Sequence, residues 1–143
     1  DLDLVDMGGV GGTLAGNPLS VAAMRATLEH VLTDEAFTGM IDTATVFVDG
    51  VRSLIDEHQL PWAINQLGAR GEYRFATPYP RNGTEAAASA NGELEDYLHL
   101  YLANRGILLT PFHNMALMAP STTVADVHRH HEIFAEALAT LPR

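Results

Sequence analysis

Two amphipathic stretches frame the second part of the chain and most constrain its fold. Residues 35–59 and residues 122–141 both carry apolar side chains at helical spacing. Between them, residues 62–67 and 73–76 are short, partly aromatic or β-branched segments separated by glycines, which is typical of a β-hairpin. This pattern predicts an α+β fold with a small antiparallel sheet and helices packed on one side of it.

The first helix is expected early in the chain. Asn17 can cap a helix, Pro18 suits its first turn, and residues 19–32 have the apolar spacing of a buried or half-buried helix. In the following helix, over residues 35–59, Gly50 weakens the helical propensity, so we expect a break near it.

The region between the hairpin and the last helix carries three further elements. Residues 77–91 should be mostly loop with one helical turn, and residues 93–104 form an amphipathic helix. The apolar run Ile107–Leu109 predicts a buried strand, and a short strand is expected at Met115–Met118. Either Thr122 or Thr123 can cap the final helix.

Composition excludes several functions. The formal net charge is −10, from 18 acidic residues and 8 arginines, which argues against nucleic acid and anionic membranes as partners. No stretch approaches the ~18 apolar residues that span a bilayer. The chain has no cysteine, so disulfides and thiolate metal sites are absent, and a cytoplasmic location is expected.

A glycine-rich motif at residues 11–18, GGTLAGNP, has the chemistry of an anion site. Its glycines let backbone N–H groups converge, Thr13 adds a hydroxyl, and the following helix start presents free N–H groups. It lacks the Gly-Lys-Ser/Thr ending of a nucleotide P-loop. The alternative is an ordinary glycine-rich turn before a capped helix.

Two strings resemble a known family. GGTLAGNPLSVAAMRATLE, at residues 11–29, is similar to the motif of class III pyridoxal-phosphate-dependent aminotransferases. YLANRGILLTPFHNMALMA, at residues 101–119, resembles the glutamate-1-semialdehyde aminomutase branch and its relatives that transaminate aromatic β-amino acids. The resemblance covers nearly the whole chain and is weakest in residues 35–60.

The resemblance implies a type I pyridoxal-phosphate transferase fold and a homodimer acting on small amino and keto acids. Residues 1–16 would end the large cofactor domain, residues 17–33 would form the connecting helix, and residues 34–143 would form the C-terminal small domain. By analogy, Thr13 would bind the phosphate of pyridoxal phosphate across the dimer interface, and Gly12 would act through its backbone.

The absence of lysine limits what this chain does alone. No side chain here can form the Schiff base with the cofactor, so the resemblance places that lysine upstream of Asp1. We therefore expect part of a larger enzyme, inactive by itself. The alternatives are a lysine-free, non-catalytic binding module and a half-enzyme that needs a separate N-terminal chain.

Arginine is suited to holding a substrate carboxylate, through two parallel hydrogen bonds. Arg105 precedes the predicted strand at residues 107–109, and Arg74 lies on the predicted strand at residues 73–76. Both are candidate substrate-binding residues, and for both the alternative is a surface base that balances nearby acids.

The loop after residue 110 supplies further candidates. Phe112, His113 and Met115 could line a substrate pocket or fill the small domain's core. His128 and His131 have helical i, i+3 spacing, with His130 between them, but the pattern is not that of a zinc helix. A solvated helix face explains these three histidines better, and no metal is predicted.

Overall fold

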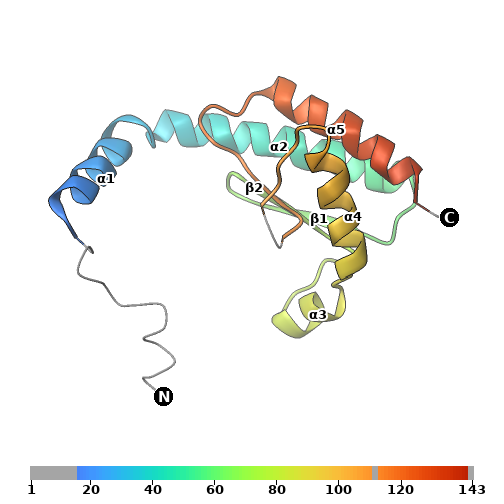
Figure 1. Ribbon diagram of the computed structural model, residues 1–143. Coiled ribbons are helices and arrows are strands. Elements are labelled where there is room, and N and C mark those ends of the chain that lie inside the picture. The colour runs from blue at the N-terminus through green and yellow to red at the C-terminus, as the bar shows by residue number, and fades with distance from the viewer. Residues whose placement is uncertain (1–15, 111–112, 142–143) are drawn as a thin grey trace, which may run out of the picture. The chain divides into compact units, whose positions relative to one another are not determined.

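The computed structural model describes residues 16–110 and 113–141, and the chain divides into two units, Asp1–Ala36 and Phe37–Arg143. In the first unit the predicted helix is confirmed as α1 (Pro18–His30), and Asn17 caps it by accepting a 3.0 Å hydrogen bond from the Ser20 N–H (Figure 1). Its predicted burial is wrong, because no residue of α1 is buried. The described part of this unit holds no second element for its apolar side chains to pack against.

The second unit is built on a three-stranded antiparallel sheet in the order β1-β2-β3. The predicted hairpin is confirmed as β1 (Ala63–Leu67) and β2 (Arg70–Arg74), with Gly68 supplying the positive φ of 57° in its turn. The predicted bounds of the second strand, residues 73–76, are wrong, because β2 begins three residues and ends two residues earlier. The predicted short strand is confirmed as β3 (Met115–Leu117), which pairs with β2.

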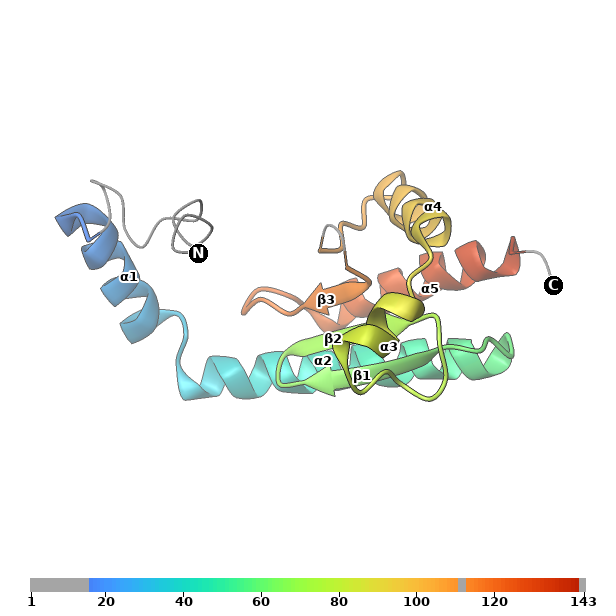
Figure 2. The same cartoon turned by 90° about the horizontal axis from the view of Figure 1, so that it is seen from below.

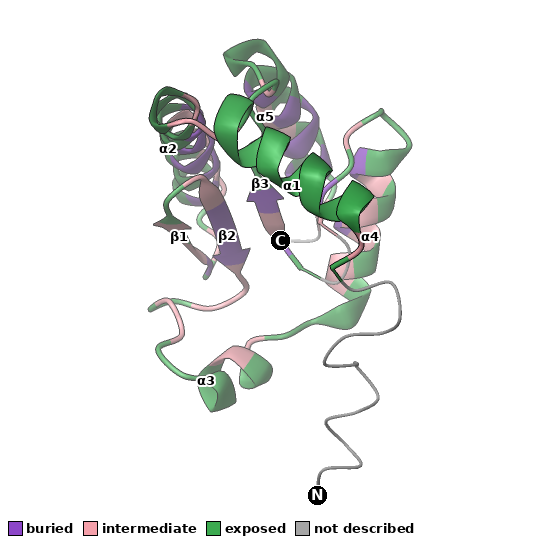
Figure 3. Ribbon diagram, turned by 90° about the vertical axis from the view of Figure 1, so that its left-hand side faces the viewer, coloured by how far each residue is buried: buried purple, intermediate pink, exposed green. Residues whose placement is uncertain are grey.

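Four helices complete this unit: α2 (Asp34–Glu57), α3 (Gly83–Ala88), α4 (Gly92–Ala103) and α5 (Val124–Ala139). From residue 37 onward, α2 lies with α5 on the same side of the sheet, as predicted (Figures 2 and 3). Thr123 caps α5 in a capping box with Asp126. Within the described residues, no helix is both long and apolar enough to cross a membrane.

Aromatic side chains join the sheet to these helices. Tyr73 of β2 is fully buried, and its ring centroid lies 5.3 Å from that of Phe134 on α5. The Tyr73 ring also stacks on the Trp62 ring, with centroids 5.9 Å apart. Burying a large aromatic side chain contributes about 1.5–3 kcal/mol, so this cluster is a main source of stability.

Two glycines allow α2 to approach its neighbours closely. A Cβ atom added at Gly50 would lie 2.1 Å from Cε1 of His131 on α5, whose Nε2 is 3.1 Å from the Phe47 carbonyl oxygen. A Cβ atom at Gly71 of β2 would lie 2.7 Å from the side chain of Val48. The expected helix break near Gly50 is wrong, because α2 continues through this residue and the glycine makes room for His131.

The predicted strand at residues 107–109 is also wrong. Thr110 N–H donates a 3.2 Å hydrogen bond to the Met115 carbonyl, but residues 107–109 have no partner in the described sheet. Leu109 is buried, whereas Leu108 is 86% exposed. Apolar character alone predicted a strand at a segment that does not pair with the sheet.

The histidines of α5 do not share one solvated face. His128 is exposed and His131 is half-buried, but His130 is only 4% exposed and packs between Phe47 and Phe134. The expectation of a solvated face is therefore wrong for His130, which shares the core-facing side of the helix with Phe134. Burial, helped by the charge of His131, lowers the pKa of His130 to about 3, so its ring is neutral.

Replacing Gly50 by alanine should destabilise the second unit, because the new methyl group overlaps the His131 ring. We expect Gly50→Ala to lower the free energy of unfolding by about 1–3 kcal/mol, measured by urea denaturation. Gly39→Ala is the matched control on the same helix, since a Cβ there meets nothing within 4 Å. This control should be neutral or stabilising by up to about 1 kcal/mol. Equal effects of the two variants would contradict the packing argument.

The buried neutral His130 should make stability depend on pH. The unfolded chain binds a proton at His130 near pH 6.5 and the folded chain only near pH 3, so stability is lost as the pH falls through this window. Between pH 6.5 and 5 the loss should be about 2 kcal/mol. In His130→Phe this loss should shrink, while a remainder persists because burial also lowers the pKa of His131. Urea denaturation midpoints of the unaltered protein and of His130→Phe, measured at pH 7.5 and 5, test this expectation. An equal pH dependence in the two proteins would contradict the assignment of the loss to His130.

Candidate functional site

The face of the sheet that points away from α2 and α5 carries the candidate site. Side chains alternate along a strand, so Glu72 and Arg74 of β2 point opposite to the buried Tyr73. Met115 of β3 is directly paired with Glu72 in the strand register and lies on the same face. Two charged residues and one flexible apolar residue are thus held on rigid strands.

Glu72 is the centre of this group. Its Oε1 lies 2.7 Å from Nη2 of Arg74 and 3.8 Å from Nδ1 of His113, and its side chain is only 11% exposed. No hydrogen bond of good geometry reaches Oε1 from the described residues, so charge attraction rather than a directed bond holds the Arg74 contact.

Backbone contacts place His113 beside this pair. Its N–H donates a 3.3 Å hydrogen bond to the Thr110 carbonyl, and its own carbonyl lies 3.1 Å from Nε2 of His99. The next residue, Asn114, is 1% exposed: its carbonyl accepts from Tyr73 N–H at 3.0 Å, and its Nδ2 donates to Oε1 of Glu95 at 3.0 Å. These contacts tie His113 and Asn114 to both β2 and α4.

The buried side of the same region is polar as well. Burial, with the nearby charge of Glu95, raises the pKa of Tyr73, whose hydroxyl has no hydrogen-bond partner among the described residues. The phenol therefore stays protonated in the core. It belongs to the packing between sheet and helices, not to the outer face that carries Arg74.

Arg105 lies in a different setting. Its guanidinium carbon is 3.6 Å from the ring centroid of Tyr101, its Nη1 donates a 3.2 Å hydrogen bond to the Tyr101 carbonyl, and its Nε lies 3.6 Å from Glu136 on α5. These contacts bind α4 to α5. Where the structure describes the chain, no recorded contact joins Arg105 to Arg74.

Three of the predicted substrate-binding residues thus come together: Arg74, His113 and Met115. Sequence reasoning missed Glu72, although its position two residues before Arg74 on a strand puts it on the same face. Phe112, Thr13 and Gly12 lie outside the described residues. Within the described ranges, no three histidine, aspartate or glutamate residues are grouped to hold a metal ion.

Comparison with known proteins identifies the family. No family model matches the chain. A variant of a glutamate-1-semialdehyde-aminomutase from Pseudomonas aeruginosa PAO1, solved in complex with PMP, is 51% identical, with a TM-score of 0.87 over 92% of this chain and 29% of its own. Glutamate-1-semialdehyde 2,1-aminomutase of Chloroflexus aggregans is 32% identical over 91% of this chain and 31% of its own length. The chain corresponds to a C-terminal segment of class III aminotransferases.

This class III segment spans about a third of the length of the curated relatives it matches. A β-phenylalanine aminotransferase from Variovorax paradoxus, 23% identical with a TM-score of 0.79 over 93% of this chain and 31% of its own, shares the fold. The predicted small domain of the type I pyridoxal-phosphate transferase fold is thereby confirmed.

Proposed function

We propose that the whole protein carrying this segment is a pyridoxal-phosphate-dependent aminotransferase or aminomutase. It moves an amino group between an amino acid, such as a β-amino acid or glutamate-1-semialdehyde, and a keto acid or aldehyde. The observation that carries the proposal is the 51% identity and TM-score of 0.87 to the Pseudomonas aminomutase over 92% of this chain.

The chemistry is divided between this segment and the rest of the protein. Bound pyridoxal phosphate supplies the electron sink. The segment has no lysine, so the covalent attachment of the cofactor belongs to residues outside it. In our proposal residues 1–16 end the large domain, residues 17–33 connect it to the small domain at 34–143, and Thr13 and Gly12 bind the cofactor phosphate.

Arg74 is our first choice for binding the substrate carboxylate. Its side chain is 23% exposed on the outer sheet face, and it is paired with Glu72 by charge without a directed hydrogen bond. His113 and Met115 lie beside it and would contact the body of the substrate, with Phe112 next in the chain. Arg105 is the second candidate, although its contacts with Tyr101 and Glu136 already use its guanidinium.

The proposal extends to assembly and location. By analogy with the family, two whole proteins form a homodimer whose phosphate site is shared across the interface, and the enzyme works in the cytoplasm. The lack of lysine supports one other candidate function, a half-enzyme that acts with a separately made N-terminal chain; a non-catalytic binding module is the remaining reading.

The whole protein should transfer amino groups, and the 143-residue chain alone should not. The assay mixes each with pyridoxal phosphate and either a β-amino acid plus a keto acid as amino acceptor, or glutamate-1-semialdehyde alone, and follows the new keto acid or the isomerised product by chromatography. In the whole protein, Thr13→Ala should release cofactor during dialysis, because a phosphate contact is lost; Thr45→Ala, on α2, is the control. A whole protein that neither retains the cofactor nor transfers an amino group would refute the function.

Replacing Arg74 should affect substrates that carry a carboxylate. We expect Arg74→Gln to raise KM for an amino acid by about tenfold to a hundredfold, since a charge-assisted hydrogen bond is lost. KM for an amine without a carboxylate should stay unchanged. Arg105→Gln is the matched control and should leave both KM values within about twofold. If instead Arg105→Gln raises KM for the amino acid and Arg74→Gln does not, Arg105 binds the carboxylate.

A further inference from the structure

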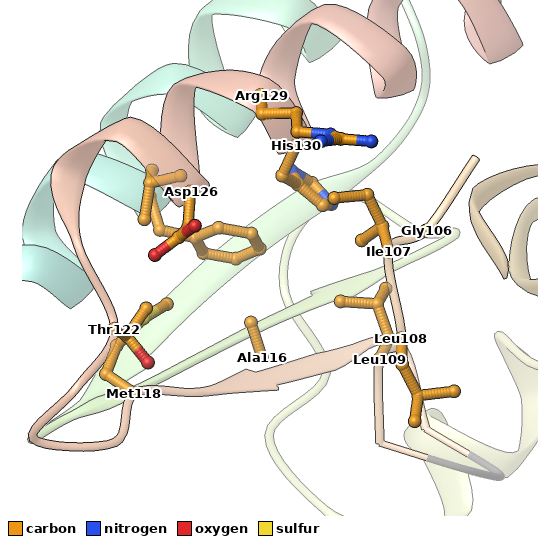
Figure 4. A pocket seen from close by; sticks show the side chains of 12 residues that line it. Gly106, Ile107, Leu108, Leu109, Ala116, Met118, Thr122, Asp126, Arg129 and His130 are labelled. Atoms are coloured by element: carbon orange, nitrogen blue, oxygen red, sulfur yellow. The ribbon is translucent and has the colours of Figure 1, made fainter.

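The proposed function does not use the pocket beside α5. This pocket has a volume of about 260 Å³ and lies between α5, β3 and residues 106–109 (Figure 4). His130 lines it, but both ring nitrogens are buried, so a ligand in the pocket does not reach them. The lining that the structure describes therefore does not select one kind of ligand. More specific chemistry lies at the start of α4.

Two exposed Asn-Gly pairs stand at helix starts in the second unit. Asn82-Gly83 begins α3 and Asn91-Gly92 begins α4, and each asparagine is the N-cap of its helix (Figure 1). Asparagine is among the chemically labile residues. A following glycine has no Cβ to shield its backbone nitrogen and lets the backbone rotate freely. That nitrogen can therefore attack the side-chain carbonyl carbon of the asparagine before it.

The fold requires neither of these two glycines. A Cβ atom added at Gly83 or Gly92 meets nothing within 4 Å, and neither residue has a positive φ. Gly50 differs, because a Cβ there would overlap the His131 ring. An alanine at position 92 therefore fits without strain. Its main effect is to hinder the backbone nitrogen, which makes it a clean probe of reactivity.

Glu85 holds the side chain of Asn82 at both ends. Oδ1 of Asn82 accepts a 3.0 Å hydrogen bond from the Glu85 N–H, and its Nδ2 donates a 2.7 Å hydrogen bond to Oε1 of Glu85. The second carboxylate oxygen of Glu85 accepts a 2.8 Å hydrogen bond from the Arg81 N–H. A hydrogen bond to a charged acceptor is stronger than a neutral one. The amide of Asn82 is thus restrained.

Asn91 has a weaker restraint. Its Oδ1 accepts a 3.1 Å hydrogen bond from the Leu94 N–H. Among the residues that the structure describes, no hydrogen bond is recorded for Nδ2 of Asn91 or for the N–H of Gly92, which is the first residue of α4. The attacking nitrogen and the departing nitrogen are therefore both open to solvent, and one neutral hydrogen bond holds the amide in place.

We propose that Asn91 is modified by spontaneous deamidation, with water as the only co-reactant. The backbone nitrogen of Gly92 bonds to Cγ of Asn91, and its proton passes through solvent to Nδ2, which leaves as ammonia when the Cγ–Nδ2 bond breaks. Water then opens the resulting succinimide ring. Opening at Cγ gives aspartate. Opening at the backbone carbonyl carbon gives isoaspartate, in which the main chain runs through the former side chain.

The two products act differently on α4. Aspartate still offers an oxygen to the Leu94 N–H, and its charge suits a helix N-terminus. Isoaspartate adds a carbon to the main chain before Gly92, so the cap geometry is lost. The first turn of α4 carries Glu95, whose Oε1 accepts a 3.0 Å hydrogen bond from Nδ2 of Asn114. Isoaspartate therefore loosens the contact that holds Asn114.

Peptide mass spectrometry of the folded protein, incubated at mildly alkaline pH, tests the site. Trypsin cleaves after arginine, so both asparagines lie in one peptide, residues 82–105, and fragmentation separates them. An unincubated sample corrects for deamidation during digestion. Asn91 should lose its amide about tenfold faster than Asn82, since only Asn82 is held by a charge-assisted hydrogen bond. Isoaspartyl methyltransferase should then label position 91.

Two variants separate the contributions of the nucleophile and the restraint. Gly92→Ala should slow the loss at Asn91 severalfold and leave the rate at Asn82 unchanged. Glu85→Ala should raise the rate at Asn82 to that at Asn91, because it removes the carboxylate that holds Nδ2 of Asn82. In the isoaspartate fraction, isolated by ion exchange, the Leu94 amide should exchange its hydrogen faster than in the fresh protein.

A synthetic peptide of residues 88–95 shows whether the conditions suffice for the reaction. If this peptide deamidates while Asn91 in the folded protein keeps its amide, the cap protects Asn91 and the proposal is wrong. It is also wrong if Asn82 reacts as fast as Asn91, or if Gly92→Ala leaves the rate at Asn91 unchanged. Should a variant fail to fold, the comparison of Asn91 with Asn82 in the unaltered protein still decides, since it needs no substitution.

Discussion

The close packing of α2 against α5 and β2 is the constraint on which the second unit depends. It requires the absence of a side chain at Gly50 and Gly71, where the His131 ring and the Val48 side chain take the space. A glycine within a helix is unfavourable by about 1 kcal/mol relative to alanine. Its presence at position 50 therefore indicates that interhelical packing outweighs local propensity.

This packing gives the sheet two chemically different faces. The face toward α2 and α5 buries Tyr73 among aromatic rings, so it is closed to solvent. The outer face holds Glu72 and Arg74, and the nearly buried Glu72 carboxylate has the Arg74 guanidinium 2.7 Å away to offset its charge. A polar site on rigid strands follows directly from strand alternation once one face is occupied.

Much of the fold could be predicted because its signals are local. Asn17 and Thr123 cap helices by contacts within three residues, and the glycine turn of the hairpin is equally short-range. The errors came from long-range packing. Residues 107–109 look like a strand but find no partner, and His130 looks solvated until the contacts from Phe47 define the core face.

The candidate site was only partly predictable for the same reason. Arg74 was predicted from its chemistry, whereas Glu72 was missed because the expected strand began at Tyr73 and β2 begins at Arg70. The sequence could not supply the approach of His113 to within 3.8 Å of Glu72, since its neighbour Asn114 is held by a hydrogen bond to Glu95 on α4. A contact between residues 19 positions apart produces no periodic pattern in the sequence.

Shifted pKa values would have pointed to different residues. Perturbed groups often mark functional sites, yet here Tyr73 and His130 are shifted mainly because they are buried in the core. Burial keeps both neutral, so neither is suited to transfer a proton near neutral pH. The outer face, by contrast, offers a paired cation on a rigid strand. Under our proposed function, this group positions a substrate whose bonds are changed by residues outside the lysine-free segment.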